Sequence, residues 1–599
     1  MRIINSRYFK AAKLQPYQSF FVEVWQSMTH SKSLDTYRVR CMNARTILRE
    51  LSEEMRIGLV DDCELYMLCS ETKAILEEDV ICSKHFPNYL QNILPFLSEI
   101  PERTPKEKGK RQENKSRLNN FCFILSDFVV ALERSYLIHL CNELKLSIKT
   151  NNEYEIRMIV SSLLSDLADR GWPLESLSSW PQNYLKVPAT HTFDENLEFM
   201  LKILQNPRQE FEVILKVAKC SSLPTIGQHG DFSFSSLSGI AHTGNPNIDK
   251  FATSYQSVCF AKTRVVDFDH RSAAVNAREN LEIVIDELRF GFEPDKLSID
   301  NLSYVERLSD NKKEIILIPY VIPNPTDDIP YSNFISFSDN LNIILKKTAI
   351  EQTSRRQLQA AIRQYRFGRD IDNFQDKFLY WWMGLEALAR NESGSIGPVV
   401  VNNVSYCMSM MYLRQILDDF LHTLQYCKIN WPKELAEVSG VNKIDELNSE
   451  QLLKVIHSKH RQILLKSCDE HTTVSFYGDI IIETLADPKK TAQYIQTHLH
   501  HLKWHLSRLW RIRCTIVHGS ESIFRLRLFT ANLEYYLRQM IIASMKIFSE
   551  YDHITSLQEI FLRASIAYEN SIEALEAPAA NQDTIRKVIS YGGLLAVPQ

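Results

Sequence analysis

The feature that most constrains this chain is a long amphipathic helix pattern that runs into Arg513, His518 and Gly519. Its apolar residues recur at steps of four, three, four and three residues: Ile495, Leu499, Leu502, Leu506 and Leu509. Such steps place residues on one face of a helix. The stripe continues to Arg513, and an arginine on a buried face is costly unless its guanidinium is paired or faces a wet cleft. Gly519 followed by Ser520 is a helix-stop signal, so we predict that the helix ends there.

Arg513 and His518 are a pair of side chains suited to chemistry at a phosphate. Arginine is a permanent cation that binds non-bridging oxygens, and histidine exchanges protons near neutral pH. On an ideal helix, positions five residues apart point about 140° away from each other. The two side chains therefore converge only if the helix loosens near Gly519, or if a second copy of the chain supplies part of the site.

The segment Arg513-Cys-Thr-Ile-Val-His-Gly519 resembles the Arg-x(4–6)-His signature of HEPN ribonucleases, especially the form Arg-Asn-x-x-x-His-Gly. The chain looks most like proteins that carry the Apea-like HEPN domain, many of which are bacterial anti-phage or abortive-infection effectors. A predicted helix over residues 371–390 also resembles a HEPN helix, because Glu386 follows the aromatic-rich run Phe378-Leu-Tyr-Trp-Trp-Met. If Glu386 faces Arg513, its carboxylate holds the guanidinium in position. The alternative is an ordinary exposed helix glutamate.

The resemblance implies a metal-independent endoribonuclease that needs no cofactor and no metal. In such an enzyme the RNA 2′-OH attacks the adjacent phosphorus, which leaves a 2′,3′-cyclic phosphate and a 5′-OH. His518 acts as general acid or base, Arg513 stabilises the charge that builds on the phosphate, and Glu386 completes the catalytic set. The residues expected to contact the RNA lie around them: Arg511, Cys514, Ser520 and Arg525.

The same resemblance implies the partners of the chain. Its substrate is RNA, with tRNA and phage or host mRNA as candidates. HEPN domains commonly form a homodimer or a higher homo-oligomer in which two Arg/His sets face one cleft. A phage-derived trigger then releases a toxic nuclease during abortive infection.

Two other interpretations remain open. The residue after the arginine of the signature is usually Asn, Asp or His, and here it is Cys514, a poorer hydrogen-bonding partner. This difference favours a non-catalytic HEPN protein that binds RNA or a partner through the same cleft. In the third interpretation the motif is accidental, because Arg-x4-His occurs by chance in many chains, and the protein is a structural helical adaptor.

Composition narrows the possible functions further. A net charge of −4 creates no overall field for nucleic acid, so an RNA contact must come from a local basic cleft. No Walker A, GxGxxG, GxSxG or HExxH motif is present. His498, His501 and His505 share one helical face at a spacing that can bind zinc, but no acidic residue lies among them. We therefore expect these histidines to line a solvent face or to extend the RNA-contacting surface.

The cysteines and the hydropathy indicate where the protein works. The twelve cysteines include no CxxC pair, which favours free thiols in a reducing cytosol. The sequence contains no apolar run of about 18 residues that would span a membrane. We expect a cytoplasmic protein that does not interact with a membrane.

The pattern along the chain predicts a mainly α protein, because periodic helices dominate and only 17 residues are glycine. A strand over 258–267, a helix over 271–290 capped by Asp269, and a β-hairpin over 304–322 interrupt the helices. The polar residues 101–117 are predicted to form a mobile loop, with an RNA-touching arm as the alternative. The predicted domains are an N-terminal helical domain 1–220, a linker 221–249, a small α/β module 250–345, a HEPN helical bundle 346–552, and a helix with a tail over 553–599.

Overall fold

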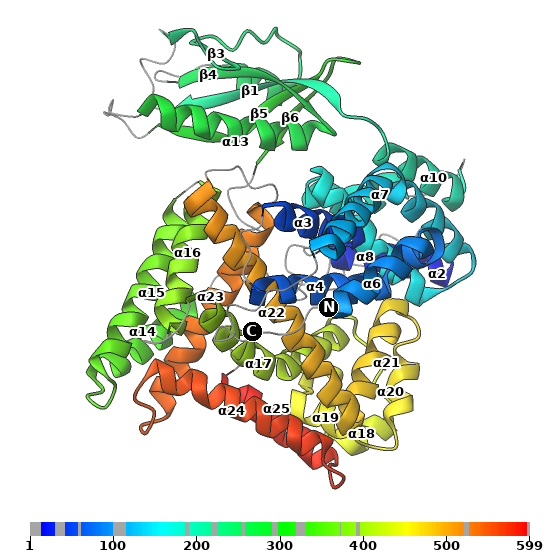
Figure 1. Cartoon of the computed structure of the whole chain (residues 1–599), viewed down its shortest axis with the longest axis vertical. Helices are drawn as coiled ribbons and strands as arrows, with labels where there is room; N and C mark the ends of the chain where they lie inside the picture. Colours follow the sequence, from blue (N-terminus) through cyan, green and yellow to red (C-terminus); the bar gives the residue numbers. More distant parts are fainter. Residues whose placement is uncertain are drawn as a thin grey trace. The chain divides into compact units, whose positions relative to one another are not determined.

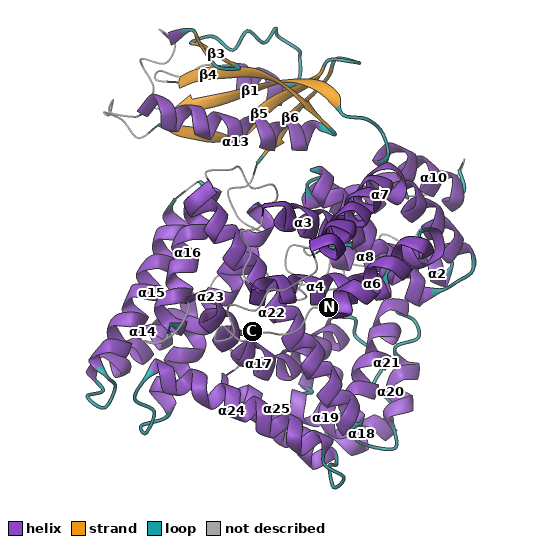
Figure 2. Cartoon of the chain, in the orientation of Figure 1, coloured by secondary structure: helices purple, strands orange, loops and turns teal. Residues whose placement is uncertain are grey.

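The protein has a mainly α fold with a small antiparallel sheet (Figures 1 and 2). The computed structural model describes residues 14–29, 42–57, 62–99, 115–185, 191–218, 226–253, 258–289, 297–318, 331–371, 373–390, 396–519 and 526–595. The chain divides into two compact units, one formed by residues 1–166 and 323–599 and the other by residues 167–322. The first unit is thus built from both ends of the chain.

Helices form the N-terminal part of the first unit. They are α2 (Pro16–Thr29), α3 (Ala44–Ile57), α4 (Asp62–Glu78), α5 (Val80–His85), α6 (Pro87–Glu99), α7 (Lys115–Lys149) and α8 (Glu153–Arg170). A buried ion pair joins three of them, because Arg45 on α3 donates to Asp166 on α8 at 2.5 Å and to Glu133 on α7 at 2.6 Å. A buried guanidinium is tolerated only when it is paired in this way. Most of the predicted loop 101–117 lies outside the described residues, and α7 begins at Lys115.

The second unit contains α9 (Leu174–Tyr184), α10 (Phe193–Leu204) and a six-stranded sheet. The strands are β1 (Gln209–Ala218), β2 (Gln228–His229), β3 (Phe232–Ser235), β4 (Val258–Asp267), β5 (Ser298–Arg307) and β6 (Lys312–Leu317), in the order β2-β3-β4-β1-β5-β6. All the pairings between them are antiparallel. Helix α13 (His270–Arg289) lies along the sheet in Figure 1, and α12 (Pro246–Ala252) also belongs to this unit.

One face of the sheet is buried by α13, and the other face is buried in part, since Lys262, Arg264 and Val266 of β4 are exposed. On one face, alternate β1 residues such as Phe211 and Val213 pack with Ala273 and Ala277 of α13. On the other face, Ile214 packs in a cluster that includes residues of α12. The alternation follows from the two-residue period of a strand. The predicted strand 258–267, the hairpin and the Asp269 cap are confirmed, since Asp269 accepts a hydrogen bond from the Ser272 amide at 2.7 Å.

The structure places the boundaries of this unit differently from the sequence prediction. Strand β1 lies at the centre of the sheet, although residues 209–218 were assigned to the N-terminal helical domain. The predicted linker 221–249 contributes β2, β3 and the start of α12, and Phe232 and Phe234 are buried in the core beside β1. The sheet unit therefore begins well before residue 250.

The C-terminal part of the first unit is a helical bundle. Its helices are α14 (Tyr331–Lys346), α15 (Gln352–Asp370), α16 (Phe374–Ala389), α17 (Ile396–Tyr426), α18 (Lys433–Ser439), α19 (Ser449–Ile456), α20 (Arg461–Ser467), α21 (Thr472–Ala486), α22 (Pro488–Gly519), α23 (Leu526–Glu550), α24 (Leu557–Glu576) and α25 (Gln582–Leu595). Helix α22 carries the signature and packs against α17, α21, α24 and α4, while α16 packs against α23. The predicted stripe is confirmed, because Ile495, Leu499, Leu502, Leu506 and Leu509 are all buried.

Residues 449–467 form two helices, α19 and α20, because the Ser458 hydroxyl donates to Val455 and accepts from the His460 amide. Such local hydrogen bonds compete with the helix. The C-terminal segment 553–599 holds two helices, α24 and α25, where one helix and a tail were expected. Within the described residues, no helix is both long enough and apolar enough to cross a bilayer.

Candidate functional site

The structure brings Arg513 and Glu386 together. Arg513 lies near the C-terminal end of α22, and its Nε is 3.8 Å from Glu386 Oε1 on α16. Both side chains are partly buried, with 24% and 17% of their surface exposed. This separation is an ion pair without a direct hydrogen bond. The guanidinium is therefore oriented by a carboxylate while part of it remains open to solvent.

Two tryptophans complete the surroundings of Arg513. Trp382 Nε1 donates a hydrogen bond to Glu386 Oε1 at 2.5 Å. The guanidinium carbon of Arg513 lies 5.2 Å from the Trp510 ring, and the two indoles are 5.7 Å apart. Spacings of three and four residues put Trp510 beside Arg513 on α22 and Trp382 beside Glu386 on α16. Aromatic faces attract the guanidinium, so the ion pair and the indoles hold it in one place.

A glycine of α17 makes room for this arrangement. A Cβ added at Gly397 would lie 2.5 Å from the Trp510 ring, a distance at which the ring has to move. Sequence reasoning identified neither Gly397 nor the tryptophans as parts of the site. The i, i+4 spacing of Trp382 and Glu386 on one predicted helix is a signal that could have linked this pair.

His518 lies in the last turn of α22 and is exposed. In the described part of the chain, no residue forms a hydrogen bond or an ion pair with its ring. Helix α22 stays α-helical as far as Gly519, so the loosening considered for this end does not occur. An α-helix that is regular over this stretch turns His518 about 140° away from Arg513. Within one copy of the chain, the two side chains therefore do not converge.

Cys514 is half-buried next to Arg513. Burial raises the pKa of its thiol above the usual value, and the carboxylates Glu64 and Glu386 raise it further, while Arg513 opposes them. The thiol is consequently protonated at neutral pH. A protonated thiol is a weak nucleophile and a weak hydrogen-bond donor, so Cys514 adds little chemistry of its own.

Arg511 occupies a different place from the one predicted. It is buried, and its Nη2 donates to Glu50 Oε1 on α3 at 2.5 Å. Arg508, one helical turn earlier, donates to Glu50 Oε2 at 2.9 Å and to Glu71 on α4 at 2.5 Å. Because protein carboxylates occupy both guanidinium groups, Arg511 is a structural residue in this arrangement and does not fit the expected role of an RNA contact.

We call these four residues the buried ion-pair cluster: Arg508, Arg511, Glu50 and Glu71. Burial alone would raise the pKa of Glu50, but Arg508 and Arg511 hold it down at about 2. The cluster ties the signature helix to α3 and α4 at a point two residues before Arg513. Its arginines were visible in the sequence as charges on a buried helix, but their partners were not.

The remaining predicted residues divide into two groups. Ser520 and Arg525 lie outside the described residues. The histidines of α22 are described, and His505 is buried with its Nε2 3.2 Å from Asn532 Nδ2, so it does not line a solvent face. His498 stacks on Tyr412 with ring centroids 3.3 Å apart. A search of the described residues finds no group of three His, Cys, Asp or Glu side chains that could hold a metal ion.

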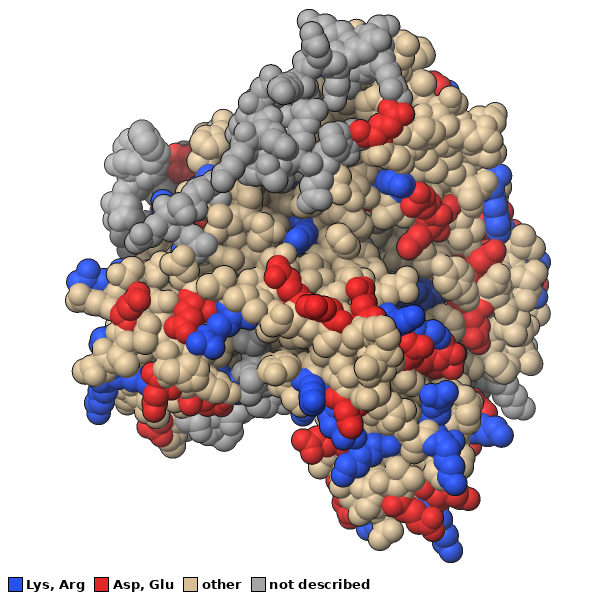
Figure 3. Space-filling view, turned by 60° about the horizontal axis from the view of Figure 1, so that its bottom comes forward, with Lys and Arg blue, Asp and Glu red and all other residues tan. Residues whose placement is uncertain are grey.

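The surface charge is mixed on the one face of the molecule that Figure 3 draws. In Figure 3, Lys and Arg side chains are interspersed with Asp and Glu over the face that is drawn. A mixed surface of this kind does not attract nucleic acid over long distances. An RNA contact on this face would therefore depend on a few local cations.

Comparison with known proteins finds no relative of this chain. The resemblance to HEPN ribonucleases depends on the residues of α16 and α22 described above. No family model matches the chain, and no curated protein or solved structure matches it either.

Proposed function

We propose that this chain is a metal-independent endoribonuclease, with Arg513 as the phosphate-binding group and His518 as the group that transfers a proton. The observation that supports the proposal best is the held guanidinium of Arg513: Glu386 pairs with it, Trp382 fixes Glu386, and the guanidinium lies over the Trp510 ring. A guanidinium fixed before the substrate arrives stabilises developing phosphate charge without reorganising during the reaction. An arginine that only stabilised the fold would not need the solvent-exposed part that the Arg513 side chain retains.

In the proposed reaction, His518 removes the proton from the RNA 2′-OH, and the 2′-oxygen attacks the adjacent phosphorus. The bond to the 5′-oxygen of the next nucleotide breaks, and that oxygen takes up a proton. Arg513 binds the non-bridging oxygens, whose negative charge rises in the transition state. The products are a 2′,3′-cyclic phosphate and a 5′-OH, and no metal takes part.

Arg513 and His518 point in different directions on a regular α22, which supports a site shared by two copies. In such a site, Arg513 of one copy works with His518 of the other. We further propose a homodimer or larger homo-oligomer, a cytoplasmic location, and a toxic role in phage defence set off by a phage-derived trigger. The cytoplasmic location, the toxic role and the phage-derived trigger come from the HEPN resemblance alone.

The test is cleavage of a single-stranded RNA by the purified protein in EDTA. We expect cleavage by the wild type, loss of at least 100-fold in the Arg513→Ala and His518→Ala variants, and no effect of His500→Ala, an exposed histidine on the same helix. An RNA with a single 2′-deoxy position should resist cleavage at that position. Equal cleavage by all variants, or cleavage that EDTA abolishes, contradicts the proposal.

The second candidate function is an RNA-binding protein without catalysis, which the half-buried, protonated thiol of Cys514 favours. It predicts RNA that is retarded in a gel but remains intact. Restoring the usual residue with Cys514→Asn distinguishes the two: a gain of cleavage shows that the thiol was the limiting feature.

A further inference from the structure

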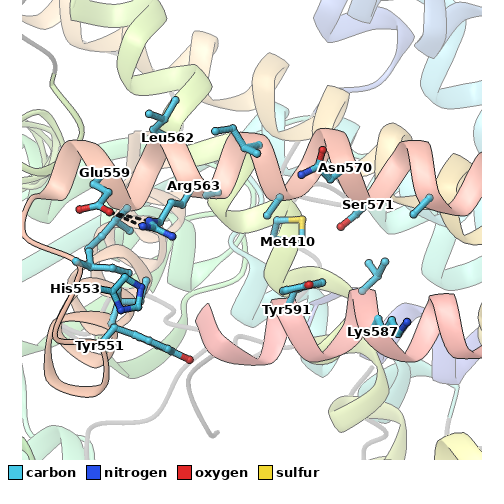
Figure 4. Close-up of a pocket in the computed structure, with 18 of the residues that line it drawn as sticks. Met410, Tyr551, His553, Glu559, Leu562, Arg563, Asn570, Ser571, Lys587 and Tyr591 are labelled. Carbon is cyan, nitrogen blue, oxygen red and sulfur yellow. Dashed lines mark hydrogen bonds and ion pairs between the residues drawn. The ribbon is translucent and has the colours of Figure 1, made fainter.

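A groove that does not include Arg513 lies between α24 and α25. It is bordered by α24 and α25, has Met410 of α17 and Ile547 of α23 among its lining residues, and has a volume of about 810 Å³ (Figure 4). Pockets that bind small molecules have volumes of roughly 300–1,000 Å³. The groove is therefore large enough for a ligand of that class.

The lining is mostly apolar. The buried residues that line the groove are Met410, Ile547, Ile554, Ile560, Ala564 and Val588. Large apolar side chains also stand exposed along it, with 58% of Leu562, 46% of Ile566 and 55% of Tyr591 accessible. An apolar surface that is concave and open to water is a characteristic of binding sites.

The charges of the groove are placed asymmetrically. At one end, Arg563 is paired with Glu559, since its Nε and Nη2 donate to Glu559 Oε1 at 2.9 and 2.7 Å. At the other end, Figure 4 shows Lys587 near Asn570 and Ser571. No carboxylate among the described residues forms an ion pair with Lys587. One unpaired cation thus lies at one end of an apolar groove whose other end is neutralised.

The groove is also long. Lining residues of α24 extend from Glu559 to Ala574, which at 1.5 Å per residue corresponds to about 22 Å of helix. Small side chains on this face, Ala564, Ala567, Ser571 and Ala574, keep the groove open along its length. This length is that of an extended long acyl chain.

We propose that the groove binds a long-chain acyl carboxylate, with the carboxylate at Lys587 and the chain running along α24 toward Ile554 and Ile547. The single cation matches a single negative head group, and the apolar lining removes the chain from water. The proposal does not rest on RNA cleavage and stands or falls separately from it. A partner helix or a second copy of the chain in the same groove is an alternative that the experiment distinguishes.

The experiment is a fluorescence titration of the full chain with cis-parinarate, an 18-carbon fatty acid that emits in apolar surroundings, below its micelle concentration. We expect saturable binding with one site per chain. Competition by saturated fatty acids should strengthen about fourfold for each added methylene until the groove is full. Hexadecanol, which has no charge, should compete at least tenfold less well than palmitate.

Variants locate the site. Lys587→Gln should weaken parinarate binding about tenfold and remove the preference for palmitate over hexadecanol, whereas Lys433→Gln, at an exposed lysine elsewhere, should change neither. Ala567→Trp fills the middle of the groove and should abolish binding. Ala574→Trp should also block the groove and abolish binding. Because position 574 is exposed, this larger side chain should not disturb the packing of the core.

Binding that is absent, or unchanged in both tryptophan variants, overturns the proposal. So does an oligomer of the wild type that dissociates in Ala567→Trp and Ala574→Trp, because a second copy then occupies the groove. Thermal unfolding of each variant shows whether its fold is retained.

Discussion

The guanidinium of Arg513 is positioned by neighbours that do not themselves touch a substrate in the proposed reaction. Glu386 fixes its direction, and Trp382 fixes Glu386 through an indole hydrogen bond at 2.5 Å. Hydrogen bonds to charged groups are worth about 1.5–3 kcal/mol. The loss of one such bond should therefore be measurable in the rate.

Trp382→Phe tests this chain of contacts. The change keeps an aromatic ring in the core but removes the Nε1–H donor, so Glu386 is freer to turn away from Arg513. We expect kcat for RNA cleavage to fall about tenfold while KM changes little, because the guanidinium still binds phosphate but is less well placed in the transition state. Trp431→Phe, which removes an indole hydrogen bond to Ser439, is the matched control. An unchanged kcat would show that Glu386 needs no such support.

Helix α22 is an element whose neighbours come from both ends of the chain. The buried ion-pair cluster joins it to α3 and α4, and the partners of Arg508 and Arg511 lie 437 to 461 positions earlier in the sequence. Breaking a buried pair by removing one partner is destabilising, because a charge is left without compensation.

Glu50→Gln should lower the free energy of unfolding by about 3 kcal/mol at pH 7. The pKa of Glu50 is about 2 in the folded chain and 4.5 as its ordinary value. Because the folded pKa is the lower one, this stabilisation is fully present above about pH 4.5 and is lost as the pH falls toward 2. Urea unfolding at pH 7 and pH 3.5 measures the difference between variant and wild type. It should shrink at the lower pH, whereas Glu573→Gln, at an exposed position, should show almost no difference at either pH. A gap that widens on acidification would contradict the assignment.

The helices and strands that have a clear hydrophobic period were predictable from the sequence, whereas ion pairs between residues far apart in the sequence were not. The stripe of α22 and the ends of β4 and α13 follow from helix and strand periods within a few residues. Strand β1 was missed because residues 213–217 are buried on both faces, which makes a short apolar run such as Val213–Leu215 ambiguous between helix and strand. The approach of Glu386 to Arg513 was anticipated from the HEPN resemblance, whereas nothing local in the sequence marks Glu50 as the partner of Arg511.

For the whole molecule, the main question is how Arg513 and His518 meet. On a regular α22 they point in different directions, so the proposed site is completed by a second copy. A dimer with two such shared sites can be tested by mixing two inactive variants.

Arg513→Ala and His518→Ala proteins should each be inactive, yet regain activity when mixed and allowed to exchange subunits. In the mixed dimer, one of the two sites receives the intact Arg513 of one copy and the intact His518 of the other. Random exchange of equal amounts makes about half of the dimers mixed, each with one working site, so about a quarter of the wild-type rate is expected. Mixing Arg513→Ala with Glu386→Ala is the comparison. Both residues of one site come from the same copy, so neither site of this mixed dimer contains both of them intact, and no activity should return. Absence of recovery after confirmed exchange would place the whole site within one chain.

The buried ion-pair cluster has a consequence for how the protein is made. Glu71 leaves the ribosome long before Arg508, from which it is separated by 437 positions. At about 5–20 residues per second, this interval corresponds to roughly 20–90 seconds. During that time the acidic side chains of α3 and α4 have no arginine to pair with, so the buried ion-pair cluster cannot form before Arg508 and Arg511 have been synthesised. Nascent chains that stop before α22 therefore carry neither the buried ion-pair cluster nor Arg513, and the ion pair between Glu386 and Arg513 can form only after α22 has been synthesised.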